Sequence, residues 1–357
     1  MASEQRLSIS ISGVLVVFAA ILSAIIGWQL RGLLLLVMIS IVLACSIAPV
    51  VNWAEQFRVP RWLGALLTYL TILGALVGVG VLIGPTVLEQ IQLLVGQLPL
   101  LLRKAVIQAE GWVLTLNDSR PELTTQLFDQ LDVQGIAAWA IRSTRQVALR
   151  SLNLTTDILS TLLSLLLAVF ISGYMLADSH TLTTNLVRLI PTPWDSKVAQ
   201  HLPEVASRIG SYIRGRLVVS GTLAVATSVG LSLLGLRDFA LGLGAIAGVT
   251  NLIPFLGPIL GAIPALLVAI PLGGWTVLWI VLFYAVLQNI ETYLLDPLLV
   301  GSSVGVHPLY QLLAVLGGAQ TLGIIGALIV PPWVAGSAVL LENLYLQPKL
   351  NSEKFKA

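Results

Sequence analysis

Polar side chains that could bind a ligand stand inside the apolar runs of this sequence. Gln288, Asn289 and Glu291 lie within one such run, and Asp296 follows it directly. Gln288 and Glu291 are three residues apart and would share one face of a helix, whereas Asp296 is expected on another face. An ionisable side chain inside a membrane-spanning helix indicates a functional site by default. The alternative is that Glu291 lies near lipid headgroups or pairs with an arginine.

A second polar group occupies residues 251–264, where an apolar run contains three prolines, two glycines and an asparagine. A helix through it would lose a backbone hydrogen bond at each proline. In hydrocarbon such losses are costly unless protein or a watery cavity satisfies the freed groups. Broken helices expose backbone groups to the substrate in many transporters, although a plain kink or a packing interface is the alternative. The predicted substrate- or ion-binding residues are Asn251, Pro254, Gly257, Pro258, Gly261, Gln288 and Glu291.

Motifs of enzymes are missing from the sequence. It has no HExxH, no Walker lysine loop, no G-x-S-x-G and no cysteine pair. His180, His201 and His307 are far apart along the chain, which does not suit a zinc site. The single cysteine, Cys45, lies in an apolar stretch and is expected to be a buried, inert thiol. We therefore predict no catalytic residues, no metal site, no cofactor and no enzymatic activity.

The composition is that of a membrane protein. Of 357 residues, 57% are hydrophobic and only 10% are charged, against about 25% charged in soluble domains. The mean hydropathy is +0.93. The net charge is only +2, and no basic run with interleaved aromatic residues appears, so a nucleic-acid partner is not expected.

A membrane crossing needs about 20 apolar residues, and the sequence predicts an all-α, polytopic protein with about eight transmembrane segments, some of them broken or re-entrant. The predicted segments are residues 12–30, 33–51, 63–87, 155–177, 217–236, 239–272, 274–300 and 308–341. The predicted organisation is three transmembrane helices (1–87), an extramembrane amphipathic insert (88–154), a fourth helix (155–177), a cytoplasmic amphipathic segment (178–216), a transport core with broken helices (217–342) and a tail (343–357).

Basic residues in short loops predict the orientation, because cytoplasmic loops carry an excess of lysine and arginine. Residues 52–62, residues 178–216 and the tail carry such residues, which predicts cytoplasmic N- and C-termini and an even number of crossings. Arg214 and Arg216 are expected at the cytoplasmic start of the fifth segment, with lipid headgroups as partners.

A short internal similarity suggests a second broken segment. Residues 259–263 (ILGAI) resemble residues 324–328 (IIGAL), and each group stands in a glycine-rich run with prolines nearby. Repeated broken segments are typical of secondary transporters. Residues 308–341 are also too long for one untilted crossing, so they are predicted to form a broken helix or a hairpin.

These motifs resemble the autoinducer-2 exporter family of bacterial multi-pass membrane proteins. The similarity rests on residues 251–264, on Gln288-Asn289-Ile290-Glu291, on the 296–308 region and on Tyr212-Ile213-Arg214-Gly215. It covers most of the chain. It implies a secondary carrier of the bacterial inner membrane that forms homo-oligomers, with autoinducer-2 export or sodium/proton antiport as the known activities.

The sequence departs from that family at two positions. Arg216 stands where members often have glutamine, and Asp296 also replaces a frequent glutamine. Both substitutions add charge, so Arg216 and Asp296, together with Gly301, are predicted gating positions. The leading hypothesis is a secondary transporter that exports a small polar molecule; a cation/proton antiporter and a non-transporting membrane scaffold are the alternatives.

Overall fold

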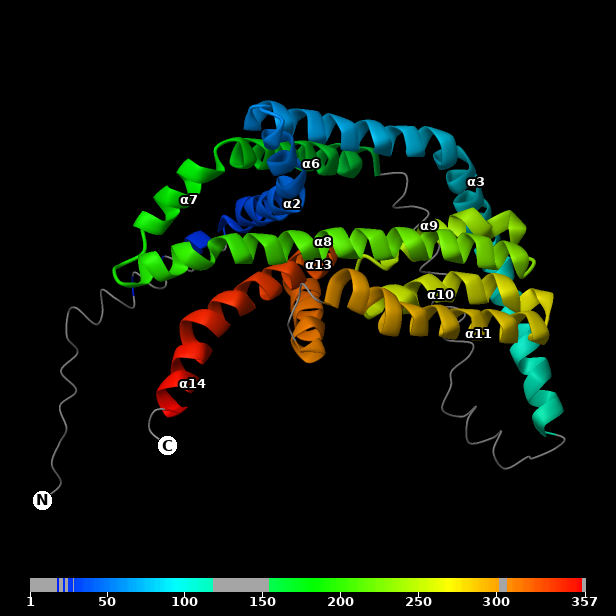
Figure 1. Cartoon of the computed structure of the whole chain (residues 1–357). Helices are drawn as coiled ribbons and strands as arrows, with labels where there is room; N and C mark the ends of the chain where they lie inside the picture. The colour runs from blue at the N-terminus through cyan, green and yellow to red at the C-terminus, as the bar shows by residue number, and fades with distance from the viewer. Residues whose placement is uncertain are drawn as a thin grey trace, which may run out of the picture.

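The computed structural model describes residues 29–117, 154–301 and 307–354, and a few single positions between residues 18 and 27. Within them every regular element is a helix, which confirms the all-α prediction (Figure 1). The first helices are α2 (Arg31–Gln56), α3 (Arg61–Asn117), α6 (Leu154–Ala177) and α7 (Ser179–Arg188). The later ones are α8 (Trp194–Leu233), η1 (Arg237–Phe239), α9 (Ala240–Thr250), α10 (Leu256–Ala269), η2 (Ile270–Leu272), α11 (Gly274–Ile290), η3 (Glu291–Gly301), α13 (Pro308–Leu341), η4 (Glu342–Leu346) and α14 (Gln347–Lys354).

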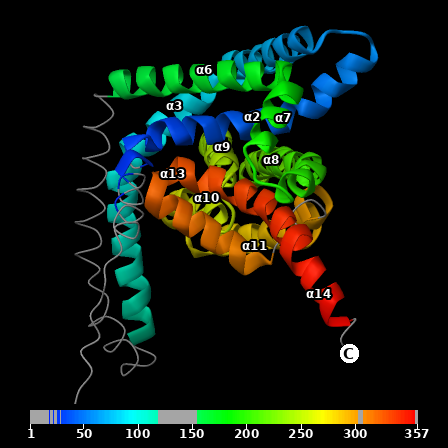
Figure 2. The same cartoon turned by 90° about the vertical axis from the view of Figure 1, so that its left-hand side faces the viewer.

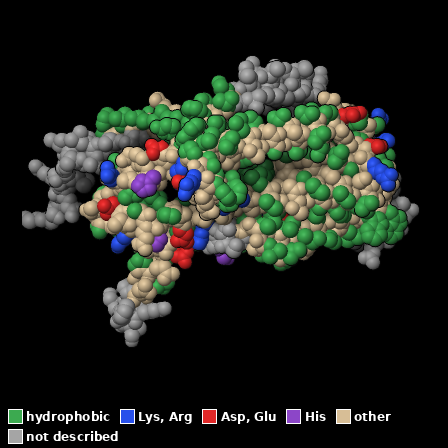
Figure 3. Space-filling model, turned by 45° about the horizontal axis from the view of Figure 1, so that its top comes forward, with side chains coloured by type: hydrophobic (Ala, Val, Ile, Leu, Met, Phe, Trp, Pro, Cys, Tyr) green, Lys and Arg blue, Asp and Glu red, His purple; other side chains and the backbone are tan. Residues whose placement is uncertain are grey.

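Five helices of the described part are long and apolar enough to cross a membrane, and the bent pair α6–α7 would make a sixth. They correspond to the predicted segments 33–51, 63–87, 155–177, 217–236, 274–300 and 308–341. The predicted segment 12–30 lies largely outside the described residues. Charged side chains gather toward the two ends of the molecule with hydrophobic ones between them (Figure 3), as a bilayer requires.

Residues 239–272 form a helical hairpin. Helices α9 and α10 have 11 and 14 residues, so at 1.5 Å per residue they are about 17 and 21 Å long, short of the roughly 30 Å hydrocarbon core. The chain reverses between Asn251 and Phe255, whose φ is +64°. The expectation that all three prolines interrupt the helix is wrong for two of them. Pro258 lies in the first turn of α10, where its missing N–H costs nothing, and α10 continues through Pro264 to Ala269.

Helix α13 counts as one long apolar helix by length and composition, but it bends sharply at Gly323 and forms a second hairpin. Gly323 has φ +70° and ψ −156°, a non-helical conformation that ends one helical arm and begins the next. The two arms contact each other next to the turn. There Gly318 and Gly326 are so close that a β-carbon on Gly318 would lie 2.4 Å from the Gly326 carbonyl oxygen. The similar residues 259–263 and 324–328 both lie in the second arm of their hairpin, near its start. In each, the central glycine (Gly261 or Gly326) faces the first arm at close range.

Helix α3 continues without a break from Arg61 to Asn117, past the predicted end of the third segment at residue 87. It contains Pro85 and Pro99 and first lies along α2 and α6, then passes α9 and α10 (Figures 1 and 2). The part of the predicted insert at residues 118–153 lies outside the described residues.

Helix α8 runs through the middle of the protein and contacts α2, α9, α13 and η3 (Figure 1). Its contact with α9 is close because small residues face each other. Gly244 and Gly248 of α9 lie against Ala224 and Ser228 of α8, at distances that leave no room for a β-carbon on either glycine. Small residues four apart allow such backbone approach between membrane helices. The hairpin α9–α10 is thereby seated directly on α8.

Candidate functional site

A buried arginine joins three parts of the chain at the centre of the protein. Nη1 of Arg216 donates to Oε1 of Glu291 at 3.0 Å and to Oδ1 of Asp296 at 3.3 Å. Its Nη2 donates to Oδ1 of Asn251 at 3.2 Å. Only 3% of the surface of Arg216 and of Glu291 is exposed, while 40% of the Asp296 side chain is exposed. We call these four residues the Arg216 cluster.

A π-helix places both carboxylates on Arg216. Residues Glu291–Gly301 form η3, in which hydrogen bonds join residues five apart. The wider turn puts positions 291 and 296 on one face, so the prediction that Asp296 points away from Glu291 was wrong. It assumed an ordinary α-helix. Gly215, next to Arg216, lets η3 approach α8, because a β-carbon there would lie 2.2 Å from the Leu299 carbonyl oxygen.

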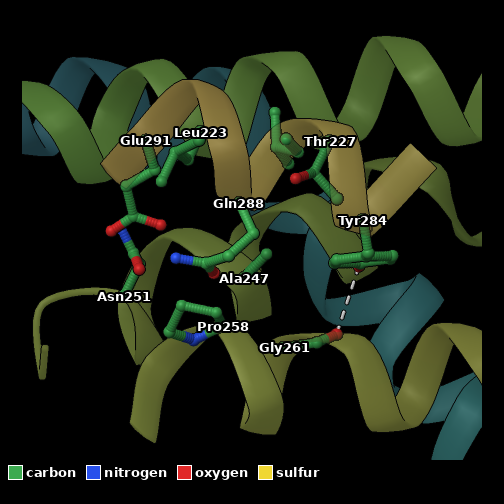
Figure 4. Close-up of a pocket in the computed structure, with 10 residues that line it drawn as sticks. Leu223, Thr227, Ala247, Asn251, Pro258, Gly261, Tyr284, Gln288 and Glu291 are labelled. Carbon is green, nitrogen blue, oxygen red and sulfur yellow. Dashed lines mark hydrogen bonds between the residues drawn. The ribbon is translucent and has the colours of Figure 1, made fainter. Parts of the chain in front are cut away.

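Asn251 brings the hairpin to the cluster. It follows the last residue of α9, at the point where the chain reverses, and only 2% of it is exposed. Its amide nitrogen faces the Glu291 carboxylate (Figure 4). Nε of Arg216 makes no hydrogen bond. The hairpin tip therefore touches both charged partners through one side chain.

A small cavity adjoins the cluster (Figure 4). Its volume is about 20 Å³, close to what one water molecule needs. The hydroxyl of Tyr284 donates to the Gly261 carbonyl at 3.2 Å across it, and Nε2 of Gln288 donates to the Thr292 hydroxyl at 3.2 Å. The cavity is lined by Leu223, Thr227, Ala247, Asn251, Pro258, Gly261, Tyr284, Leu287, Gln288 and Glu291.

Two hydroxyls on α8 near this region lack partners. Thr227, which lines the cavity, is fully buried, and Ser220 is 4% exposed. Neither hydroxyl makes a hydrogen bond. A buried polar group without a partner costs free energy, so these groups are suited to bind water or a polar ligand. Together with the Arg216 cluster they form a polar region inside an otherwise apolar protein.

The charges of the cluster do not cancel. With both carboxylates ionised, one arginine and two acids sum to −1. The buried pair Arg216–Glu291 is neutral, so the surplus charge belongs to Asp296, whose side chain is 40% exposed and accessible to a counter-ion or a proton. The cluster can therefore respond to the arrival of a cation or a proton.

Most residues predicted for the site lie together. Asn251, Glu291, Arg216 and Asp296 contact one another, and the two positions at which the sequence departs from the family pattern, 216 and 296, form an ion pair. Pro258, Gly261 and Gln288 line the cavity.

Other predicted residues have different surroundings. Pro254 lies in the reversal of the chain, and Gly257 packs on the Thr250 carbonyl. Gly301 is the last residue of η3 and does not line the cavity. Tyr284 and Thr227 were not predicted; Thr227 could have been found by its position three turns from Arg216 on α8.

The headgroup prediction for the two arginines was wrong. Both lie near the middle of the 40-residue helix α8, not at its end. Arg216 is buried in the cluster, and Arg214 donates to the carbonyls of Cys45 and Ser46. Of the alternatives for Glu291, pairing with an arginine is the one observed. Among the described residues no three His, Cys, Asp or Glu side chains gather in a group that could hold a metal ion.

Comparison with known proteins identifies the family. A model of the AI-2E family transporters matches residues 14–346. The chain is 30% identical to "Putative transport protein YrrI" of Bacillus subtilis over 309 residues, 85% of this chain and 84% of that protein. It is 28% identical to "Putative transport protein YueF" of the same organism, over 85% of this chain and 81% of that protein. It is 27% identical to "Putative transport protein sll0063" of Synechocystis, over 92% and 81% respectively. With a match over nearly its whole length and apolar helices long enough to cross a bilayer, this membrane protein belongs to the AI-2E transporter family.

Proposed function

We propose that this protein is a secondary transporter that exports a small polar molecule across the cytoplasmic membrane, and that the Arg216 cluster and the adjoining cavity form its binding site. The observation that carries the proposal is the buried, charged cluster at the tip of a broken helix. Charged groups at membrane depth are costly and mark transport pathways. In known secondary transporters, the substrate and ion sites are formed where helices are broken.

The polar groups that line the cavity suit a neutral, hydroxyl-bearing cargo. The Asn251 amide, the Thr227 hydroxyl and the Gln288 amide offer both donors and acceptors. The guanidinium of Arg216 is already neutralised by two carboxylates, which disfavours an anionic cargo. Autoinducer-2, the cargo implied by the family resemblance, is one candidate of this class.

The cavity is too small for such a cargo, so this conformation corresponds to a closed state. Cargo would enter when the α9–α10 hairpin moves away from α11. The contacts that must open are the hydrogen bond between Tyr284 and Gly261 and the contact of Asn251 with Arg216. Alternating access would then depend on this hairpin.

The surplus negative charge favours a second candidate, cation/proton antiport. Glu291 is the buried member of the cluster and Asp296 the accessible one. A cation and a proton could neutralise the cluster in turn, which is the exchange that an antiporter performs. The same property would couple export of a neutral molecule to the proton gradient.

Location, orientation and assembly belong to the same proposal. We expect the protein in the bacterial inner membrane with both termini in the cytoplasm, as a homo-oligomer in contact with lipid and without a nucleic-acid partner. Two of the five basic residues first assigned to the cytoplasmic segment 178–216 are not free to face lipid, since Arg214 and Arg216 bind within the protein. The orientation is therefore supported by Arg188, Lys197 and Arg208, with the basic loop at 52–62 and the tail.

The test is transport by the purified protein in proteoliposomes. Autoinducer-2 is offered outside inside-out proteoliposomes, whose outer surface corresponds to the cytoplasmic face, and its accumulation inside is measured while a pH-sensitive dye reports proton movement. We expect cargo movement that depends on a proton gradient and falls by about tenfold or more in Glu291→Gln, since each 1.4 kcal/mol of lost interaction is a factor of ten. Glu353→Gln, an exposed position in α14, is the matched control and should transport normally.

Each result selects one hypothesis. Proton movement driven by sodium without cargo movement would identify an antiporter. Neither flux above that of protein-free vesicles would refute transport of the tested solutes and favour the scaffold alternative. Normal cargo transport by Glu291→Gln would refute the Arg216 cluster as the site.

A further inference from the structure

About two turns of α8, residues 210–216, contact four separate parts of the protein. We call them the contact segment. Gly210 and Arg214 contact α2, Tyr212 contacts α13, Gly215 contacts η3, and Arg216 contacts η3 and the hairpin tip. Most of the motif Tyr212-Ile213-Arg214-Gly215 thus makes contacts between elements. Of the residues in the contact segment, Arg216 is the only one that the proposed function uses.

The contact with α2 is unusually close. A β-carbon on Gly210 would lie 2.1 Å from the carbonyl oxygen of Cys45. Beside it, Nη1 of Arg214 donates to the carbonyls of Cys45 at 3.3 Å and of Ser46 at 3.0 Å. Nη2 of Arg214 donates to the Ser211 hydroxyl at 2.9 Å, which holds the guanidinium along α8. The backbones of α2 and α8 therefore meet at one point, and an arginine bridges them there.

A proline explains why a backbone carbonyl needs this arginine. Pro49 lies inside α2, four residues after Cys45. In an uninterrupted helix the N–H of residue 49 would bond the Cys45 carbonyl, but proline has no N–H and its ring crowds that carbonyl. An unsatisfied carbonyl within a membrane costs free energy, which neighbouring side chains can offset. Arg214 supplies the missing donor from another helix.

We propose that Arg214 is a positioning residue: by replacing the hydrogen-bond donor that Pro49 removes, it fixes α8 on α2 and so holds Arg216 at Glu291. Residues 214 and 216 are two apart, so they project about 200° apart around α8. One side of the helix is thereby fastened to α2 while the other presents Arg216 to the cluster. That holding Arg216 in place serves transport rests on the proposed function. The hydrogen bonds of Arg214 between α8 and α2 do not depend on that function.

The single cysteine of the chain reports on this contact. Cys45 is half-buried and packs with Val42, Ile209 and Ile329 at the junction of α2 and α8. If the junction loosens, N-ethylmaleimide will reach the thiol faster. Because no other cysteine is present, the labelling of the full-length protein in lipid nanodiscs reports on this junction and on no other part of the chain.

The experiment compares the unmodified protein with Arg214→Leu, Pro49→Ala and the double variant. Arg214→Leu is expected to raise the labelling rate about tenfold, the effect of losing a hydrogen bond from a charged donor. Pro49→Ala restores an N–H for the Cys45 carbonyl, so the double variant should label within about threefold of the unmodified protein. Arg188→Leu, which removes an exposed arginine of α7, should label at the unmodified rate. In the transport assay, Arg214→Leu should raise KM, and Pro49→Ala should restore it.

A proline inside a helix is itself destabilising, so the rescue counts for this role only if Pro49→Ala alone labels at the rate of the unmodified protein, with the recovery confined to the Arg214→Leu background. Equal labelling of Arg214→Leu and the unmodified protein would overturn the proposal, and so would equal labelling of Arg214→Leu and the double variant. If Arg214→Leu cannot be purified in folded form, recovery of folded protein by adding Pro49→Ala supports the proposal and continued failure overturns it. A protein that transports none of the tested solutes would still give a decisive labelling result.

Discussion

Replacing Arg216 with methionine should destabilise the protein because it leaves Glu291 buried without a counter-charge. Methionine keeps much of the length and apolar volume of the side chain. The Glu291 side chain is only 4% exposed and lies 3.0 Å from Nη1 of Arg216. At this distance and an effective dielectric constant near 20, the attraction is about 5 kcal/mol. Removing one member of a buried pair typically costs about 3–5 kcal/mol.

The expected fall in melting temperature follows from the size of the chain. Unfolding entropy near the midpoint is about 2.1 cal/mol/K per residue, and the chain has 357 residues. A loss of about 3–5 kcal/mol then lowers Tm by about 4–7 °C. The nine tryptophans allow unfolding to be followed by intrinsic fluorescence in lipid nanodiscs. All variants should be heated at one scan rate, because membrane proteins often unfold irreversibly.

Two companion variants make the reasoning refutable. Glu291→Gln should cost less, about 1–2 kcal/mol, because Arg216 keeps Asp296 and Asn251 as partners. Combining Arg216→Met with Glu291→Gln should recover most of the lost stability, since no buried charge is then left unpaired. If Arg216→Met and Glu291→Gln lower Tm equally, or if the double variant melts no higher than Arg216→Met, the assignment of an uncompensated buried carboxylate is wrong.

Three further substitutions test two contacts at the site and the turn of α13. Gly215→Ala should lower Tm and transport together, because its β-carbon would lie 2.2 Å from the Leu299 carbonyl oxygen and force η3 away from α8; an unchanged Tm would contradict this. Tyr284→Phe removes the hydrogen bond to Gly261 and should destabilise the closed state by about 1 kcal/mol. Faster maleimide labelling of Thr227→Cys in a Cys45→Ala background would show this, and unchanged labelling would contradict it. Gly323→Ala should lower Tm, since φ +70° with ψ −156° is a conformation that costs other residues about 1–3 kcal/mol; a normal melting curve would mean that the turn of α13 can relax.

The broken segment could be predicted from sequence because prolines and amides are conspicuous in an apolar run. Residues 251–264 do contain the reversal of the chain, and Asn251 is at its start. Which proline breaks the helix could not be predicted by counting prolines. A proline in the first turn, such as Pro258, lacks an N–H that would have had no helical partner, so its position relative to the reversal decides its effect.

The relation between the two carboxylates could not be predicted, because it depends on a local change of helix type. Residues five apart diverge on an α-helix and converge on a π-helix. Nothing in the spacing of Glu291 and Asp296 distinguishes the two. The ion pairs of Arg216 with Glu291 and Asp296 stabilise the arrangement in which both carboxylates share one face. This helps to offset the poorer backbone geometry of η3.

The arginines of α8 show why a charged residue at the edge of an apolar run is a poor marker of the membrane boundary. Arg214 and Arg216 end the polar stretch of the sequence, which favours a span that begins at residue 217. Helix α8 instead begins at Trp194, about 30 Å before them at 1.5 Å per residue. Each arginine finds acceptors that the sequence alone does not reveal. Arg214 bonds the Cys45 carbonyl freed by Pro49 and the neighbouring Ser46 carbonyl, and Arg216 bonds two carboxylates and an amide. Acceptors contributed by other helices therefore place these charges inside the protein, where hydropathy would place them in water.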